Sequence, residues 1–318
     1  VQVDFVPGYL VTSDNPDTDQ HWQETSLDTQ PIHKHPLAND QRMRQKALRD
    51  EAIRLAKESD QVLYFGGLNH DFDVEAKDRE NIELPYQQDE LISELLDVKP
   101  DTVIHLLSGS ALDLSMWAQK AKVILWSSYL GMEGGNALVS TIYGDVSPSG
   151  KLTQTFARKL TDYSSHSIGM FPGDAQVEYT EEADVGYRHF EKQRITPAFC
   201  FGHGLSYATF EYDHFTIEKS ESGWKVQLSI RNTSGILAKE IVQMYTQKAN
   251  QHASPILAGF QKVTLRPLET FRVESIIDEA AFQEYDTQTH AMRTISGAYH
   301  ILVGSSLKRI HHTFHIDI

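Results

Sequence analysis

The pattern of hydrophobic residues changes near residue 205, and this change constrains the possible folds more than any other feature of the 318-residue sequence. Before it, short apolar runs such as VLYF (62–65) alternate with segments in which apolar residues recur at helical spacing. After it, segments such as WKVQLSIRN and FRVESII alternate apolar and polar residues with a period of two. The first pattern predicts a mostly parallel sheet with helices on both faces, and the second predicts an antiparallel β-sandwich.

We therefore predict two domains. The first is an α/β domain over 1–205, with a polar loop at 11–41 and a connecting segment at 145–205, and the second is an all-β sandwich over 206–318. Within the first domain, the spacing of apolar residues predicts strands at 1–10 and at about 62–66, 102–107 and 122–127. The same spacing predicts helices over 43–58, about 87–97, near 111–119 and over 134–143.

Charge and cysteine content restrict the partners and the covalent chemistry. The formal net charge is −15, whereas proteins that bind nucleic acids or anionic membranes need a positively charged surface. We therefore expect neither as a partner. Cys200 is the only cysteine, which excludes an intrachain disulfide and leaves oxidising and reducing compartments open. No apolar run approaches the roughly 18–20 residues of a membrane span. The opening stretch VQVDFVPGYL lacks a basic start, so we expect no signal peptide in this chain.

The stretch DFDVEAKDRENIELP (71–85) directly follows the predicted strand at 62–66 and is unusually acidic. Its carboxylates are Asp71, Asp73, Glu75, Asp78, Glu80 and Glu83. Ligands of parallel sheets bind beyond the carboxyl ends of the strands, which is where this stretch lies. A carboxylic acid works as a general acid only where burial or a neighbouring charge raises its pKa. From the residues alone, a solvated loop and a site of acid catalysis both stay open.

Three other motifs have ordinary structural interpretations. The segment GDVSPSGKL (144–152) departs from a phosphate-binding loop because five residues rather than four separate its two glycines, and we predict a turn before a strand. Cys200 lies between two phenylalanines and is expected in the core, and no G-x-S-x-G elbow supplies a serine nucleophile. His311 and His315 fall on one face of a predicted terminal strand, about 13 Å apart. One ion cannot bind both, so we predict no metal site.

Longer blocks carry a resemblance. GGLNHDFDVEAKDRENIELPYQQDELI joins a strand end, the acidic loop, L-P and a helix, and GMEGGNALVSTIYGDVSPSGKLTQTF follows it. A third block ends in FGHGLSY, and a fourth contains ILAGFQKVTLRPLET and GAYHILVGSS. In this order they resemble glycoside hydrolase family 3, with its W-E-x-E-x-x-D-R-like loop, its P-S-G-K-L-P-x-T-F block and its fibronectin-III-like domain. The resemblance covers nearly everything from about 45 to 318.

The resemblance implies β-glucosidase-like or β-xylosidase-like hydrolysis with retention of configuration. It also implies a barrel domain, an α/β sandwich and a fibronectin-III-like domain, in that order. Matched position by position, the family's catalytic acid/base falls on Glu75, and its Asp-Arg pair falls on Asp78 and Arg79, which we expect to support the loop. A retaining glycosidase uses two carboxyl groups about 5–5.5 Å apart, one as nucleophile and one as acid and then base. We therefore expect no cofactor.

Departures from the family pattern concern the substrate. Phe72 stands where many members have tryptophan, and it is a candidate for contact with the sugar of the substrate. An aromatic residue at a strand end also packs within the fold, so both roles stay open for Phe72 and for Trp126. Ala76 and Lys77 stand where many members have glycine and an aromatic residue, which leaves the preferred sugar open.

The family's nucleophile is an aspartate of the barrel, and a barrel needs about 250 residues, more than the α/β part of this chain supplies. We therefore expect the C-terminal part of a larger β-glucosidase, whether fragment, cleavage product or subunit, with the barrel-bearing N-terminal portion as its partner. A β-xylosidase of the same family is one alternative, and a non-catalytic carbohydrate-binding or scaffolding module is another. A homo-oligomer stays possible, and a bacterial enzyme of the cytoplasm, the periplasm or the exterior fits equally well.

Overall fold

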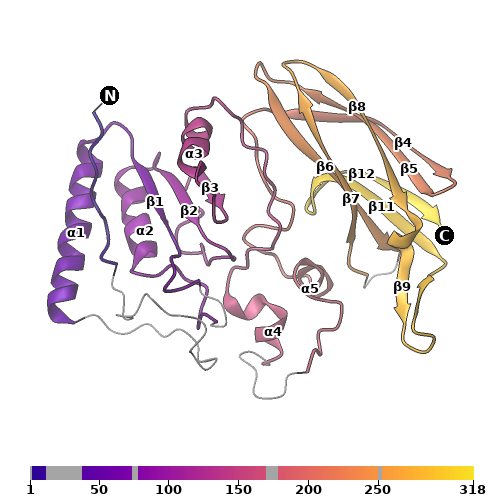
Figure 1. Cartoon of the computed structure of the whole chain (residues 1–318), viewed down its shortest axis with the longest axis horizontal. Coiled ribbons are helices and arrows are strands. Elements are labelled where there is room, and N and C mark those ends of the chain that lie inside the picture. Colours follow the sequence, from indigo (N-terminus) through magenta and orange to yellow (C-terminus); the bar gives the residue numbers. More distant parts are fainter. Residues whose placement is uncertain (1, 12–37, 74–77, 170–177, 250–252) are drawn as a thin grey trace. The chain divides into compact units, whose positions relative to one another are not determined.

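Figure 1 shows the computed structural model of the chain, which describes residues 2–11, 38–73, 78–169, 178–249 and 253–318. The chain forms two compact units. The first contains Val1–Gly131 and Ala157–Glu178, and the second contains Met132–Phe156 and Tyr179–Ile318. We placed a domain boundary between residues 205 and 206 from the sequence pattern alone. This boundary stays a prediction.

The first unit is built on a three-stranded parallel sheet of β1 (Leu63–Gly67), β2 (Val103–Leu107) and β3 (Val123–Ser127). The order in the sheet is β1-β2-β3, with Leu63 beside Val103 and Val103 beside Val123. The three strands predicted after the polar loop are thereby confirmed to within one residue at each end. Because the strands are parallel, the segments that leave their carboxyl ends all begin at one edge of the sheet.

Two long helices accompany this sheet, as Figure 1 shows. They are α1 (Asn39–Glu58) and α2 (Gln88–Val98), and they confirm the helices predicted over 43–58 and 87–97. The amphipathic face of α2 buries four apolar side chains in the core, those of Leu91, Ile92, Leu95 and Leu96. Burial of each contributes about 1.5–3 kcal/mol, which makes apolar packing the main anchor of α2.

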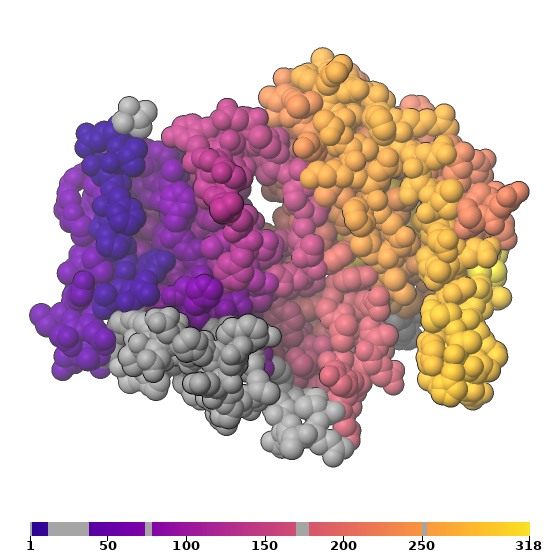
Figure 2. Space-filling view, in the orientation of Figure 1, coloured from indigo at the N-terminus to yellow at the C-terminus, as the bar shows by residue number. Residues whose placement is uncertain are grey.

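Three expectations for the first unit were wrong. Residues 2–11 form no strand, because they pair with no neighbouring strand; instead the backbone N–H of Leu10 donates to the buried side chain of Gln45 on α1. Figure 2 shows this segment as an indigo strip on the surface of the unit. Helix α1 begins at Asn39, within the predicted loop 11–41. The segment 111–119 forms turns rather than a helix.

The helices between β3 and the β-sandwich are short. The first unit contains a 3₁₀ helix, η1 (Leu160–Asp162), and α4 (Ser164–Ser167). The second unit contains α3 (Gly134–Ile142) and α5 (Tyr187–Lys192), and α3 confirms the helix predicted over 134–143.

Two antiparallel sheets make up most of the second unit. One sheet has the order β4-β5-β8, with β4 (Phe210–Ser220), β5 (Gly223–Asn232) and β8 (Thr270–Asp278). The other has the order β12-β11-β6-β7, and its strands are β6 (Ala238–Lys248), β7 (Ile256–Leu265), β11 (Ala298–Ser306) and β12 (Arg309–Asp317). A 3₁₀ helix, η2 (Glu279–Phe282), precedes a small hairpin of β9 (Gln283–Asp286) and β10 (Ala291–Thr294).

The two sheets share one hydrophobic core. On β5, Val226, Leu228 and Ile230 alternate with more exposed residues and point into it. Val242 and Met244 of β6 enter the same core from the other sheet. This alternation from both sides is the pattern of a β-sandwich, so the predicted fold class, an α/β domain followed by an all-β sandwich, is confirmed.

The second unit also contains Cys200 and the histidines His311 and His315, for which the sequence made predictions. Cys200 is buried beside Tyr245 and Leu307, which confirms its place in the core. His311 and His315 lie on the terminal strand β12, where His311 stacks on Tyr212 with ring centroids 3.9 Å apart. Within the described ranges, no group of three or more His, Cys, Asp or Glu side chains could hold a metal ion. No helix of these ranges is long and apolar enough to cross a membrane.

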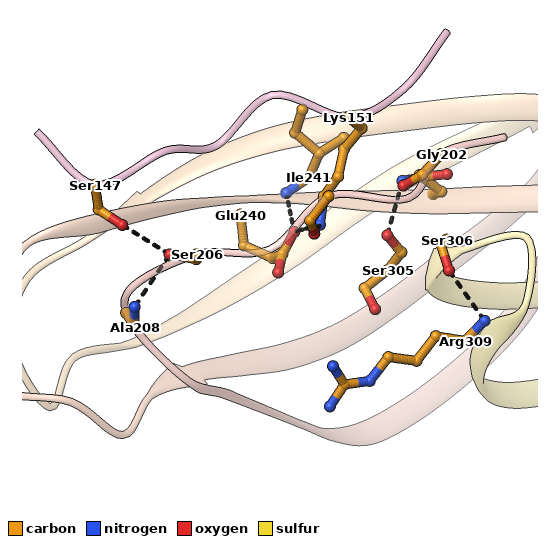
Figure 3. Close-up of polar contacts among 12 residues, drawn as sticks. Ser147, Lys151, Gly202, Ser206, Ala208, Glu240, Ile241, Ser305, Ser306 and Arg309 are labelled. Atoms are coloured by element: carbon orange, nitrogen blue, oxygen red, sulfur yellow. Dashed lines mark hydrogen bonds and ion pairs between the residues drawn. The ribbon is translucent and has the colours of Figure 1, made fainter. Parts of the chain in front are cut away.

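The segment 144–152 is anchored by a buried polar cluster, which we define as Ser147, Lys151, Ser206 and Glu240 (Figure 3). The ammonium of Lys151 lies 2.8 Å from a Glu240 carboxylate oxygen and donates to the Gly204 carbonyl at 2.7 Å. The same carboxylate oxygen accepts the backbone N–H of Ile241 at 2.7 Å. The hydroxyls of Ser147 and Ser206 are 2.9 Å apart. The cluster therefore ties this segment and the one near 204 to β6.

For the segment 144–152 the predicted turn is correct, and the predicted strand after it is wrong. The chain turns as expected, but no regular strand follows. Leu152 instead exchanges backbone hydrogen bonds with Gly202 and His203, and Phe156 forms an isolated bridge with Phe199. These contacts replace the sheet partner that a strand would require.

Candidate active site

The acidic stretch begins where β1 ends. The backbone N–H of Leu68 still donates to the Leu107 carbonyl of β2 at 2.8 Å. The chain then turns over Asn69, whose carbonyl accepts the N–H groups of Phe72 and Asp73 at 3.0 Å each. Gly67 has φ +129°, and a Cβ there would lie 2.0 Å from the Leu107 carbonyl oxygen, so glycine is required at this exit.

The side chain of Gln88, at the start of α2, fixes the same exit. Its amide oxygen accepts the backbone N–H of Gly67 and the hydroxyl of Tyr64, both at 2.9 Å, and its NH₂ group donates to the Gly67 carbonyl at 2.8 Å. Burying these groups without partners would cost free energy, so the paired arrangement holds the strand end and the helix start together.

Asp89 holds the far end of the acidic stretch. One carboxylate oxygen accepts the indole N–H of Trp117 at 2.7 Å, and the other accepts the backbone N–H of Leu84 at 3.1 Å. Burial raises the pKa of Asp89 to about 6, although both hydrogen bonds favour the ionised form. The side chains of Gln88 and Asp89, at the start of α2, therefore bind the backbone at the two ends of the acidic stretch.

Phe72 packs inside this loop. Its ring meets Tyr86 edge-on, with centroids 5.3 Å apart, and Tyr86 stacks on Tyr9 at 6.0 Å. The hydroxyl of Tyr86 donates to Asp71 at 2.9 Å and accepts from Asn69 at 3.0 Å. Phe72 stays partly exposed beside Tyr86, and its contact with the sugar of the substrate stays a prediction.

Asp73 connects the loop to the ends of the two other strands. One of its carboxylate oxygens accepts the backbone N–H of Gly109 at 3.0 Å and the hydroxyl of Tyr129 at 2.7 Å. Gly109 follows β2 and Tyr129 follows β3, so all three strand ends meet at this carboxylate. Burial, and then the hydrogen bond to Asp73, raises the pKa of Tyr129 to about 12.

Arg79 anchors the stretch on its other side. Its Nη2 donates to the Ser110 hydroxyl at 2.8 Å and to the Ala111 carbonyl at 3.2 Å. Its Nη1 is buried and has no hydrogen-bond partner among the described residues. Burial lowers the pKa of Arg79, and the charge of Asp73 opposes this shift. The guanidinium still remains charged, since arginine does not lose its proton in proteins.

The predicted site residues have different outcomes. Glu75, the expected acid/base, lies outside the described residues, as do Ala76 and Lys77. Asp78 is exposed, and its role in supporting the loop stays a prediction. The contacts of Arg79 suit the supporting role expected for it.

The sequence did not indicate Asp73, Gly109 and Tyr129 as partners, because it does not show which strand ends are neighbours. The available signal was their common position just after a predicted strand. Trp126 lies in β3 and donates its indole N–H to Ser108 at 2.8 Å, which favours packing over stacking on a ligand.

Comparison with known proteins agrees with this geometry. The family model described as the Glycosyl hydrolase family 3 C-terminal domain matches residues 10–207. The chain belongs to glycosyl hydrolase family 3. A second model, the Fibronectin type III-like domain, matches residues 240–307, within the β-sandwich. The family recognised from the sequence blocks is thereby confirmed.

The relatives in this family include proteins named beta-glucosidase and solved structures. The chain is 37% identical over 270 residues to thermostable beta-glucosidase B of Acetivibrio thermocellus, which covers 82% of the chain and 35% of the relative. It is 36% identical over 275 residues to a probable beta-glucosidase I of Aspergillus oryzae, and this match covers 82% of the chain and 32% of the relative.

A solved structure with a similar fold is the beta-glucosidase of Kluyveromyces marxianus in complex with glucose, with a TM-score of 0.82 and 29% identity. It covers 89% of the chain, which covers 34% of that enzyme. The chain therefore spans about a third of the length of the family 3 relatives it matches.

Proposed function

We propose that this chain is the C-terminal part of a retaining β-glucosidase and supplies its general acid/base, Glu75. The observation that carries the proposal is the identity to proteins named beta-glucosidase over 82% of the chain, including the loop with Glu75. The anchoring of both sides of this loop at one sheet edge supports it further, because a catalytic acid must be held in place. A barrel outside this chain supplies the nucleophile.

The chemistry then follows from two carboxyl groups. A carboxylate of the barrel attacks the anomeric carbon, and Glu75 donates its proton to the departing glycosidic oxygen. The covalent glycosyl-enzyme forms with inverted configuration. Glu75, now ionised, removes a proton from water, and that water releases the sugar with a second inversion. Phe72 offers one ring face to the substrate, and Asp78 and Arg79 support the loop.

The decisive experiment is Glu75→Ala in the complete enzyme, meaning this chain together with its barrel portion. General acid catalysis contributes roughly 10²–10⁴-fold, so kcat/KM for β-glucosides with poor leaving groups should fall by that order. The loss should be much smaller for dinitrophenyl β-glucoside, whose leaving group departs without a proton. Glu221→Ala, which removes an exposed carboxylate remote from this stretch in the sequence, is the control and should behave like the wild type. An equal loss for good and poor leaving groups would contradict the role of Glu75.

The sugar and the partner are tested separately. We expect a higher kcat/KM for nitrophenyl β-glucoside than for nitrophenyl β-xyloside, and the reverse ranking would make the enzyme a β-xylosidase. Native mass spectrometry of the enzyme purified from its source should show this 36.0 kDa chain covalently or tightly joined to a barrel-sized portion. A stable 36.0 kDa species that binds sugar without hydrolysing it would support a non-catalytic module.

A further inference from the structure

Resting on the proposed function, we propose that Asp73 and Tyr129 are positioning residues for acid/base catalysis. Asp73 lies just before the segment that carries Glu75, and its carboxylate is bound by the chain that follows β2 and by Tyr129, which follows β3. The two residues fix the start of the catalytic segment to the sheet edge. They act through Glu75 and not on the substrate.

The hydrogen bonds of Asp73 have the properties of a positioning device. A carboxylate that accepts an N–H and an O–H forms charge-assisted bonds, which are stronger than bonds between neutral groups. The hydroxyl of Tyr129 approaches to 2.7 Å and the N–H of Gly109 to 3.0 Å. The donors come from the segments that follow two different strands, so one carboxylate oxygen holds both segments.

Gly109 makes this close approach possible. A Cβ built at Gly109 would lie 2.7 Å from the Asp73 carboxylate oxygen and 3.1 Å from Cε2 of Tyr129. Any other residue at this position would push the carboxylate away from its donors. The glycine is therefore part of the same device, through its lack of a side chain.

Arg79 secures the other side of the segment on the next residues of the same strand exit, Ser110 and Ala111. Asp73 and Arg79 are thus both bound by residues 109–111. An error of 1 Å in the distance between a catalytic acid and the glycosidic oxygen can cost about 10²-fold in rate, so we expect the binding of Asp73 and Arg79 to matter for Glu75.

The test uses Tyr129→Phe in the complete enzyme. This change removes one hydroxyl, and Tyr129 is 50% exposed, so the fold should survive. We expect kcat/KM for poor leaving groups to fall roughly 10- to 100-fold, with a change of less than about twofold for dinitrophenyl β-glucoside. Asp73→Asn should behave in the same way. The matched control is Tyr285→Phe, which removes a hydroxyl bonded to His290 from a tyrosine that is 57% exposed.

A double variant separates positioning from a merely structural role. If Tyr129 acts through Glu75, adding Tyr129→Phe to Glu75→Ala should cause no further loss with poor leaving groups. Losses that multiply, or a loss from Tyr129→Phe that is the same for all leaving groups, would overturn the inference and leave Glu75 as the acid. If Glu75→Ala itself shows no dependence on the leaving group, the proposed function fails, and the positioning role fails with it.

Discussion

Two groups of charged residues in this molecule are held in opposite ways. In the first unit, Asp73 and Arg79 lie at a sheet edge, are partly exposed, and bind backbone groups and hydroxyls. In the second unit, the ammonium of Lys151 and the carboxylate of Glu240 pair directly, and their side chains are only 10% and 8% exposed. The comparison teaches that a buried charge pair is satisfied by its own members, whereas charges at a sheet edge are satisfied by backbone groups and hydroxyls of neighbouring segments.

Physical reasons support this division. A buried ion pair repays its desolvation only if its geometry is good and its remaining polar atoms find partners. Lys151 also donates to the Gly204 carbonyl, and the paired oxygen of Glu240 also accepts the backbone N–H of Ile241. Such a pair cannot exchange partners without cost. Polar groups at the edge of a sheet stay within reach of solvent and of a ligand.

The largest expected effect is on stability, from Glu240→Ala. Removing the carboxylate leaves the Lys151 ammonium buried and unpaired, which should lower the free energy of unfolding by about 3–5 kcal/mol. Urea unfolding monitored by circular dichroism measures this. Glu218→Ala breaks an exposed pair with Lys225 and should leave the urea midpoint unchanged.

The double change Lys151→Met with Glu240→Leu sharpens this test. Replacing a whole buried pair by apolar residues of similar size is often neutral. Recovery of most of the lost stability would assign the pair a purely structural role. If Glu240→Ala matched Glu218→Ala, the contrast between the two regions would be wrong.

A smaller effect, on both stability and activity, is expected from Gly109→Ala. The added methyl would overlap Asp73 and Tyr129, and such overpacking costs about 1–3 kcal/mol. Hydrolysis of poor leaving groups should fall as for Tyr129→Phe. Gly131→Ala is the control, because a Cβ at Gly131 meets nothing within 4 Å. Full activity in Gly109→Ala would show that the close packing at Asp73 has no catalytic consequence.

An effect of similar size is a dependence of stability on pH from Asp89. Its folded pKa of about 6 lies above the ordinary value of 3.8, so between these pH values the folded state holds a proton that the unfolded state has lost. Stability should therefore fall as pH rises through this window, by at most about 1.4 kcal/mol per pH unit. Asp89→Asn should remove this slope and add only a constant offset. A wild-type slope equal to that of Asp89→Asn, measured by urea unfolding from pH 4 to 7, would contradict the raised pKa.

Much of the fold could be predicted from sequence, because apolar periodicity reports burial directly. The strands of the parallel sheet and the helices α1, α2 and α3 were predicted in this way. The segment 2–11 failed, since an alternating sequence needs a neighbouring strand to become one itself. The prediction for 111–119 was wrong. The sequence did not reveal that Trp117 lies in a turn and donates its indole N–H to Asp89 of α2.

The site was predictable only where a motif carries it. The acidic loop and Arg79 were found from residue patterns along the chain. Asp73, Gly109 and Tyr129 were not, because their contact depends on the order β1-β2-β3 in the sheet. The pair of Lys151 and Glu240 was missed for the same reason, since its members are distant in sequence and meet only in the folded unit.

The central claim is that Glu75 is the acid/base of a retaining enzyme, and azide tests it most directly. In Glu75→Ala, water can no longer be deprotonated, but the azide anion needs no base to attack the glycosyl-enzyme. With dinitrophenyl β-glucoside, azide should accelerate turnover of this variant and give β-glucosyl azide, identified by NMR. No acceleration, or an α-glucosyl azide product, would contradict the account, because the latter is expected when a nucleophile rather than an acid/base has been removed.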